Sequence, residues 1–345
     1  MIVGLEIDGA GADPAAWRGA EVDPRAILTG ELALRAVQRA EAAGVDFVTL
    51  VDALEAPDDV PDRVSVRLDA LGLAARIAPL TERIGLLPAI TVTHTEPFHV
   101  QASVATLDHI SGGRGGWVAE VSSSAAAAAV VGRREPAPAA ETWREARYVL
   151  DASRQLWDSW DDDAVIRDAS TGRYVDREKL HYVDFESPTF SVKGPSIVPR
   201  PPQGHPVTAI RANTPDALEA AADAEVVLLP DPDLQAITIT RLRASGAGEG
   251  RAPGDCDGLA IRHSGPLVLV SVEVRPHVDG VDGLVGLIEG WAAAGADGVH
   301  LRPGSLELDV PVIADQLLPL LRERGLVGPA ERGGSLRGRL GLVRP

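Results

Sequence analysis

The sequence of 345 residues contains very little sulfur, with one methionine and one cysteine, Cys256. A lone cysteine forms no internal disulfide and excludes a cysteine-based zinc cluster. No stretch approaches the ~18 uncharged apolar residues that a membrane-spanning helix requires. Residues 1–8 have neither a basic segment nor a long apolar run, so we expect no signal peptide. These absences predict a cytoplasmic protein.

Basic residues are also scarce, with 33 Lys and Arg against 50 Asp and Glu, which gives a formal net charge of -17. Such a surface repels nucleic-acid phosphates and anionic lipids, so we expect neither nucleic acid nor membrane as a partner. The content of 45% hydrophobic and 24% charged residues is that of an ordinary soluble globular protein. The length suits a single domain over residues 1–345, near the usual upper size.

Short apolar runs alternate with helical patterns along the chain. The expected strands are 2–7, 45–51, 84–92, 116–121, 206–210, 226–229, 266–274 and 297–301. The expected helices are 31–43, 68–80, 97–110, 142–157, 215–222, 234–242, 281–294 and 310–324, and Gly44 is placed to end the first of them. This succession of strand–helix units predicts an α/β fold, a parallel TIM (β/α)8 barrel.

An open doubly wound sheet is the competing fold. It would place a glycine-rich dinucleotide turn after the first strand, followed directly by a helix. Residues 9–14 read GAGADP, and Pro14 stands where that helix should begin. The barrel is therefore favoured.

Two segments interrupt the alternation. Residues 161–204 carry turn signals at 171–172 and 187–188 and end in a proline-rich loop, which predicts a hairpin-bearing insertion after the fourth helix. We expect this insertion to help shape the substrate pocket. Residues 245–265 are rich in Gly, Ala and Asp and are interpreted as a flexible surface loop.

Loops that follow the strands of such a barrel form its functional site. Asp52 ends the second expected strand, where it either holds a hydroxyl or amide of a ligand or caps a neighbouring loop. Thr91, Thr93 and His94 follow the third strand and suit a polar ring system. The alternative is that one threonine caps the next helix while the others face solvent.

Arg211, Asn213 and Thr214 join the fifth strand to a helix N-terminus. Backbone N–H groups and the helix dipole favour an anion there, and Arg211 adds a positive charge, which predicts a phosphate site. The alternative is an N-cap at Asn213 or Thr214 beside a surface arginine. No metal is expected, because His94 and His99 are five residues apart and do not share a helical face. No nucleophile motif or P-loop assigns catalytic residues.

Several runs resemble the bacterial-luciferase-like flavin monooxygenases. These are RLDAL at 67–71, TERIGL at 81–86 and EPFHV at 96–100. The run LDHISGGRGGW at 107–117 is the most specific and is similar to the nitrilotriacetate and dibenzothiophene-sulfone monooxygenase branch. The same holds for LWDSW at 156–160, SVKGP at 191–195 and LRGRLGL at 336–342. The likeness covers nearly the whole chain.

The resemblance implies a TIM barrel that binds reduced FMN (FMNH2) at its mouth and uses O2 as co-substrate to oxygenate a small organic substrate. It also implies a separate NAD(P)H:flavin reductase as a partner, and a homodimer or higher homo-oligomer. Flavin-contacting positions of the family map onto Asp52, the 91–94 cluster, Asn213 and Thr214.

The sequence departs from the family pattern at three places. Val118 stands where asparagine usually follows the tryptophan, and Thr142 and Trp143 replace an Arg-Tyr pair. Residues 210–217 read IRANTPDA in place of the usual QAGSSP followed by AG. These changes keep open a non-catalytic or weakly flavin-binding paralogue that acts as a partner subunit. A deazaflavin-dependent reductase on the same barrel is the third hypothesis.

Overall fold

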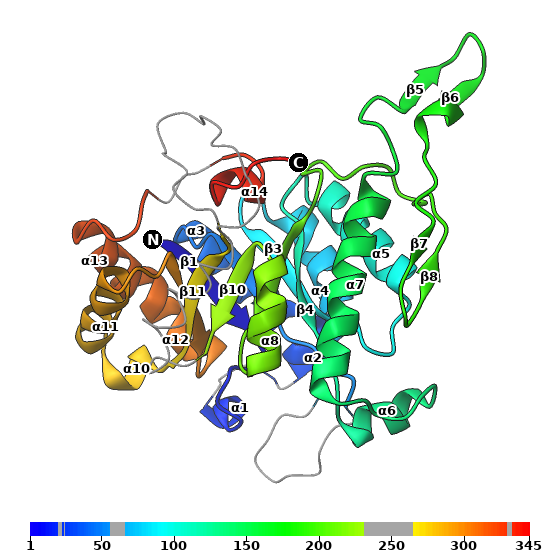
Figure 1. The fold of residues 1–345 in the computed structure, drawn as a ribbon. Helices are drawn as coiled ribbons and strands as arrows, with labels where there is room; N and C mark the ends of the chain where they lie inside the picture. The colour runs from blue at the N-terminus through cyan, green and yellow to red at the C-terminus, as the bar shows by residue number, and fades with distance from the viewer. Residues whose placement is uncertain (20–22, 24, 56–65, 231–264, 330–332) are drawn as a thin grey trace.

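The computed structural model describes residues 1–19, 23, 25–55, 66–230, 265–329 and 333–345 (Figure 1). The strands predicted for the barrel are present as β1 (Ile2–Ile7), β2 (Phe47–Leu50), β3 (Gly85–Thr91), β4 (Gly116–Glu120), β9 (Val207–Arg211), β10 (Val226–Leu229), β11 (Leu267–Val274) and β12 (Gly298–Pro303). They pair in parallel and close into a barrel in the order β1-β12-β11-β10-β9-β4-β3-β2. The predicted TIM-type fold is confirmed, and the open sheet is excluded.

Helices surround this barrel (Figure 1). They are α3 (Glu31–Ala42), α4 (Ala70–Ile77), α5 (Pro97–Ile110), α7 (Ala139–Trp157), α8 (Pro215–Ala220), α11 (Asp282–Ala293), α12 (Leu306–Val312) and α13 (Leu318–Glu323). Gly44 follows α3 in the left-handed conformation, with a φ of 82°. The predicted helix 234–242 and nearly all of the predicted loop 245–265 lie outside the described residues.

The last predicted helix, 310–324, differs from the observed one. The helix begins earlier, at Leu306, and a π-helical segment at Ile313–Leu317 separates α12 from α13. Pro311 lies inside α12, where it has no N–H to donate to the helical ladder. A local change of helical hydrogen bonding next to such a residue is expected.

The structure also contains short helices that the sequence analysis missed. They are α1 (Ala16–Gly19), α2 (Arg25–Thr29), α6 (Ala125–Val131), α10 (Pro276–Asp279) and α14 (Leu336–Arg339), with a 3-10 turn at Arg177–Lys179. The 3-10 turns at Ala78–Leu80 and Ala221–Asp223 lie at the ends of the predicted helices 68–80 and 215–222. Alanine is the strongest helix former, so the run in α6 is helical. Ser124 caps it, since its hydroxyl accepts a hydrogen bond from the N–H of Ala127 at 3.1 Å.

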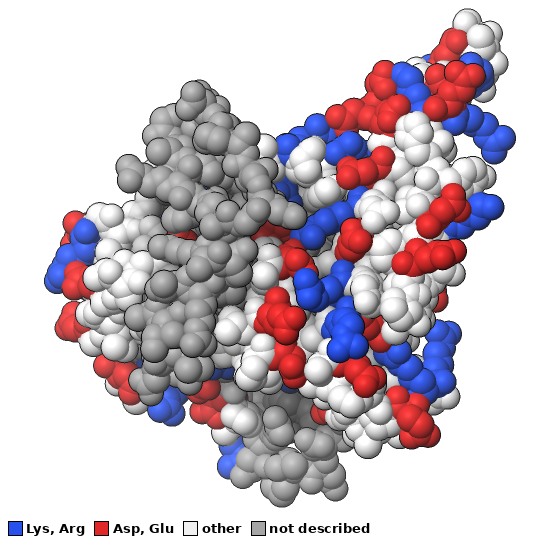
Figure 2. Space-filling view, in the orientation of Figure 1, with Lys and Arg blue, Asp and Glu red and all other residues white. Residues whose placement is uncertain are grey.

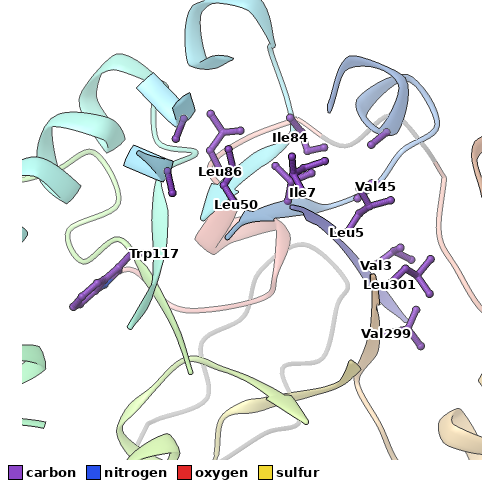
Figure 3. Packing of buried hydrophobic residues seen from close by; sticks show 14 of the residues in the cluster. Val3, Leu5, Ile7, Val45, Leu50, Ile84, Leu86, Trp117, Val299 and Leu301 are labelled. Carbon is purple, nitrogen blue, oxygen red and sulfur yellow. The ribbon is translucent and has the colours of Figure 1, made fainter. Parts of the chain in front are cut away.

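The core has an outer and an inner part, because side chains alternate between the two faces of each strand. On the outer face, Val3 and Leu5 of β1 lie beside Val299 and Leu301 of β12 (Figure 3). The inner cluster fills the barrel from the opposite face of the strands. It contains Phe47, Leu87, Val118, Val207, Leu228 and Leu269.

Helix α14 closes the N-terminal end of the barrel. Leu336 and Leu340 belong to the inner cluster, and Leu336 is fully buried. Arg337 donates to Glu225 at 3.1 Å and to the carbonyl of His205 at 2.9 Å. The base of the barrel is therefore filled by side chains.

The insertion contains the predicted hairpins. Strands β5 (Val165–Asp168) and β6 (Arg173–Val175) pair antiparallel, as do β7 (Phe185–Glu186) and β8 (Ser191–Val192). The β5–β6 hairpin projects from the body of the molecule and carries acidic and basic side chains together (Figures 1 and 2). Arg344 near the C-terminus donates to Asp162 at 2.7 and 3.0 Å. This contact fixes the insertion to the end of the barrel that α14 closes.

Within the described residues, none of the helices has both the length and the apolar character needed to cross a bilayer.

Candidate functional site

A cavity of about 420 Å³ opens at the mouth of the barrel. Its charged lining residues come from the C-terminal ends of four strands, and they are Glu6, Asp8, Glu120, Arg211 and Arg302. Small-molecule sites range over about 300–1,000 Å³ and favour this end of a TIM barrel. The cavity thus has the place and the size of a ligand site.

Arg211 lies at the centre of an ion-pair cluster in the floor of the cavity. Its guanidinium Nη2 is 2.6 Å from Glu6 Oε2, and its Nε is 3.7 Å from Glu120 Oε1. Burial disfavours the charge of Arg211, but the two carboxylates outweigh that effect and raise its pKa. The charge predicted to attract a phosphate is therefore already compensated by two carboxylates.

Glu120 is the titratable side chain of this cluster. Burial raises the pKa of Glu120, and the neighbouring charge of Glu6 raises it further, while Arg211 opposes both effects. One guanidinium cannot fully compensate the charges of two carboxylates. Glu120, the more distant of the two, is therefore the easier to protonate. Glu120 can consequently hold a proton inside the cavity.

The other two charges differ in how they are paired. Asp8 accepts a hydrogen bond from Arg67 Nε at 3.1 Å at the rim. The side chain of Arg302 has no hydrogen bond or ion pair to another described residue, and its Nε is buried. Arg302 is thus a cavity cation whose charge no described carboxylate compensates.

The walls of the cavity bring together Trp143, Asn213 and Thr214. Thr214 caps α8, because its hydroxyl accepts a hydrogen bond from the N–H of Ala217 at 3.2 Å. Of the two predicted candidates, Thr214 and not Asn213 is therefore the N-cap. Trp143 offers a flat apolar surface, and Asn213 an amide, to whatever the cavity binds.

A second cavity of about 200 Å³ lies at the ends of β2 and β3. Asp52 and Thr91 line it, together with His99. The carboxylate of Asp52 also accepts hydrogen bonds from the N–H groups of Ala53 at 2.7 Å and Ala70 at 2.9 Å. Burial raises the pKa of Asp52, and the hydrogen bond from Ala70 opposes that shift. Asp52 therefore both holds the first turn of α4 and borders this cavity.

Thr93 and His94 line neither cavity. The hydroxyl of Thr93 accepts a hydrogen bond from the N–H of Ser122 at 3.1 Å, which ties the loop after β3 to the loop after β4. His94 has a left-handed backbone, with a φ of 68°, and neither ring nitrogen has a hydrogen-bond partner. Burial lowers the pKa of His94, and Arg134 lowers it further. The structure thus separates the predicted 91–94 cluster.

A buried histidine lies below the floor of the cavity, two residues before Arg302 on β12. Its ring nitrogens are 2.8 Å from the hydroxyl of Thr49 and 2.9 Å from that of Ser271. Burial lowers the pKa of this residue, His300, well below its ordinary value, and Arg211 and Arg302 add to the shift. The ring is therefore neutral and bound at both nitrogens.

Sequence reasoning missed Glu6 and Glu120 and assigned no role to Arg302. Each stands near the C-terminal end of a barrel strand, and a charge at that position could have identified it. None of residues 161–204 lines either mouth cavity, so their expected role in shaping the substrate pocket stays a prediction. The insertion follows α7, and the helix of a strand–helix unit returns the chain to the opposite end of the barrel.

Among the described residues, no group of three or more His, Cys, Asp or Glu side chains is arranged to hold a metal ion.

Comparison with known proteins identifies the family. Residues 16–266 match the luciferase-like monooxygenases. The chain belongs to this family. A curated member, N-acetyl-S-(2-succino)cysteine monooxygenase of Bacillus subtilis (strain 168), is 25% identical over 99% of this chain and 97% of its own length.

Two further members confirm the branch that the sequence runs indicated. Nitrilotriacetate monooxygenase component A of Aminobacter aminovorans is 33% identical over 66% of this chain and 53% of its own length. Dibenzothiophene-sulfone monooxygenase of Rhodococcus erythropolis is 31% identical over 69% and 55%. The match spans about half the length of these two luciferase-like relatives.

Solved structures of luciferase-like type share the barrel. EDTA monooxygenase from Chelativorans sp. BNC1 superimposes with a TM-score of 0.85 at 20% identity, over 100% of this chain and 99% of that one. Long-chain alkane monooxygenase also gives 0.85, at 19% identity, over 99% and 95%. At these identities the likeness establishes the fold alone.

Proposed function

We propose that this luciferase-like protein is a monooxygenase that takes reduced FMN from a separate NAD(P)H-dependent reductase and uses O2 to oxygenate a small organic substrate. The observation that carries the proposal is the cavity at the barrel mouth, which Asn213 and Thr214 line together with Trp143. Bound reduced FMN would supply the chemistry by which O2 is activated. The protein would bind and orient the flavin and the substrate and would exclude water.

The residues of the mouth suit such a cofactor. Trp143 presents an aromatic face, and Asn213 and Ser123 offer polar groups around a space of about 420 Å³. Glu120, beside Arg211, is placed to hold a proton near bound ligands. An FMN complex of 3,6-diketocamphane monooxygenase from Pseudomonas putida has the same barrel, with a TM-score of 0.57 at 14% identity.

The test supplies reduced FMN through a flavin reductase and NADH under isotope-labelled O2, with a panel of small organic acids, amines and sulfur compounds. We expect one labelled oxygen atom in a product that requires the protein. Asn213→Trp should abolish this product, because the larger side chain obstructs the cavity. The proposal would be contradicted if hydrogen peroxide were the only labelled product for every compound of the panel, at the same yield with and without the protein.

A companion chain without its own flavin site is the second candidate. Val118 is fully buried in the inner cluster, where the family asparagine would offer an amide. One of the two chains of pristinamycin IIA synthase from Streptomyces pristinaespiralis is 39% identical over 57% of this chain and 61% of its own length. If this candidate holds, the isolated protein leaves reduced FMN unbound and co-purifies with a related luciferase-like chain.

Binding of a deazaflavin in place of FMN would instead support the deazaflavin-dependent reductase.

A further inference from the structure

Arg302 is the feature of the mouth that the proposed function does not use. It comes from β12, two residues beyond His300, and lines the large cavity. Its Nε is buried and has no acceptor, and no described residue forms an ion pair with it. The terminal N–H groups of its guanidinium are not enclosed in this way and have no described partner either, so they are the donors that a ligand in the cavity can meet.

The neighbouring charges show why Arg302 is available. Arg211 is held by Glu6 at 2.6 Å and approached by Glu120 at 3.7 Å. Asp8 is bound to Arg67 at 3.1 Å. The three carboxylates that line the cavity are thus engaged by other cations, and none of them is paired with Arg302.

We propose that Arg302 binds an oxyanion of the ligand, a carboxylate or a phosphate, inside the mouth cavity. A guanidinium presents a planar fork of N–H groups that matches either oxyanion with two hydrogen bonds. The identity of the ligand, substrate or flavin, rests on the proposed function. The cavity and the unpaired side chain of Arg302 do not depend on that function.

The charge pattern also orients such a ligand. Glu6 and Glu120 repel an anion from the Arg211 side of the floor, whereas Arg302 attracts it. The oxyanion therefore lies at β12, and the neutral or cationic part of the ligand faces Glu6 and Glu120. The favoured ligands are organic anions that carry a polar or cationic group at the other end.

The test compares Arg302→Gln and Arg302→Lys with the wild type on two matched pairs of probes. FMN and riboflavin differ by the phosphate, and succinate and succinamide differ by charge. Dissociation constants are measured by calorimetry with the full chain. Arg275→Gln is the control, since Arg275 is exposed, lies 4.0 Å from Asp279 and does not line the cavity.

We expect the wild type to prefer at least one charged probe over its neutral partner by about tenfold or more. Arg302→Gln should abolish that preference, Arg302→Lys should keep part of it, and Arg275→Gln should keep all of it. Loss of the FMN preference identifies a phosphate, and loss of the succinate preference identifies a carboxylate. Melting curves without ligand verify that each variant is folded.

Two outcomes would overturn the inference. One is a wild type that shows neither preference. The other is a preference that persists unchanged in folded Arg302→Gln. The succinate measurement needs neither flavin nor O2, so its failure is distinguishable from a failure of the monooxygenase proposal.

Discussion

Glu120 and Glu6 share the guanidinium of Arg211, and this sharing determines how the floor of the cavity responds to pH. Arg211 lies nearer to Glu6, at 2.6 Å, than to Glu120, at 3.7 Å. Glu120 therefore carries the weaker compensation, and its pKa is raised, chiefly by burial. At the scale of the residue, Glu120 is a cavity carboxyl group whose pKa is raised by its surroundings.

Glu120→Gln is predicted to change how stability depends on pH. The pKa of Glu120 is higher in the folded than in the unfolded chain, so folding takes up a proton between the two values. The stabilisation is present below the unfolded pKa and is lost as the pH rises through the folded pKa. Because the glutamine does not titrate, the free energy of unfolding of the wild type should fall relative to that of the variant as the pH rises.

Urea denaturation at a series of pH values measures this difference, and Arg211 retains Glu6 as a partner in the variant. Glu186→Gln, at the exposed residue of strand β7, provides the control for surface titration. A difference between wild type and Glu120→Gln that stays constant over the whole pH range would contradict the assignment.

Helix α14 is held in the base of the barrel by a buried ion pair. The side chains of Arg337 and Glu225 are 2% and 3% exposed and lie 3.1 Å apart. Burial alone would raise the pKa of Glu225, but Arg154 and Arg337 outweigh it and lower that pKa. The pair therefore joins the end of the chain to the segment that leads into β10.

Arg337→Met keeps most of the side-chain volume and removes the charge. It should lower the free energy of unfolding by about 3–5 kcal/mol, because Glu225 loses a buried partner. Arg344→Met, at an exposed pair with Asp162, should cost no more than about 1 kcal/mol. Urea denaturation of both variants measures the comparison, and equal losses would show that burial does not decide the role of α14.

Elements with a strong period were predictable from sequence, and elements that depend on tertiary contacts were not. Helix α3, whose apolar residues recur with the helical period, begins at the predicted residue 31 and ends at Ala42, one residue before the predicted end. Helix α14 is one turn long, and its position depends on Leu336 and Arg337 meeting residues more than 100 positions away. No local pattern reports such partners.

The run that identified the family has a structural task. Gly112 and Gly113 have φ values of 65° and 87°, a region that disfavours other residues. Arg114 is buried and donates to the carbonyls of Ala78, Thr81, Ile84 and Ser111 at 2.8–3.0 Å. These contacts lie before β3 and β4, at the closed end of the barrel. The run therefore indicates the fold, while the floor of the cavity was visible in the sequence only as charges at strand ends.

At the scale of the whole molecule, the residues that stabilise the fold and the residues that line the cavity lie at opposite ends of the barrel. The N-terminal end is filled by α14 and braced by the insertion through Arg344 and Asp162. The opposite end holds the cavity with Glu120, Arg211 and Arg302. Substitutions at the base are therefore expected to act mainly on folding and substitutions at the mouth mainly on ligands, although Glu120 also affects how stability depends on pH.

The most direct measurement of the central claim is an anaerobic titration of the protein with reduced FMN, followed by flavin fluorescence. The account predicts saturable binding to the wild type. Asn213→Trp, which obstructs the cavity, should abolish it, and Ser170→Trp, in the exposed β5–β6 hairpin, should leave it intact. A wild type that does not bind reduced FMN, or one whose affinity is unchanged in folded Asn213→Trp, would contradict the mouth cavity as the flavin site.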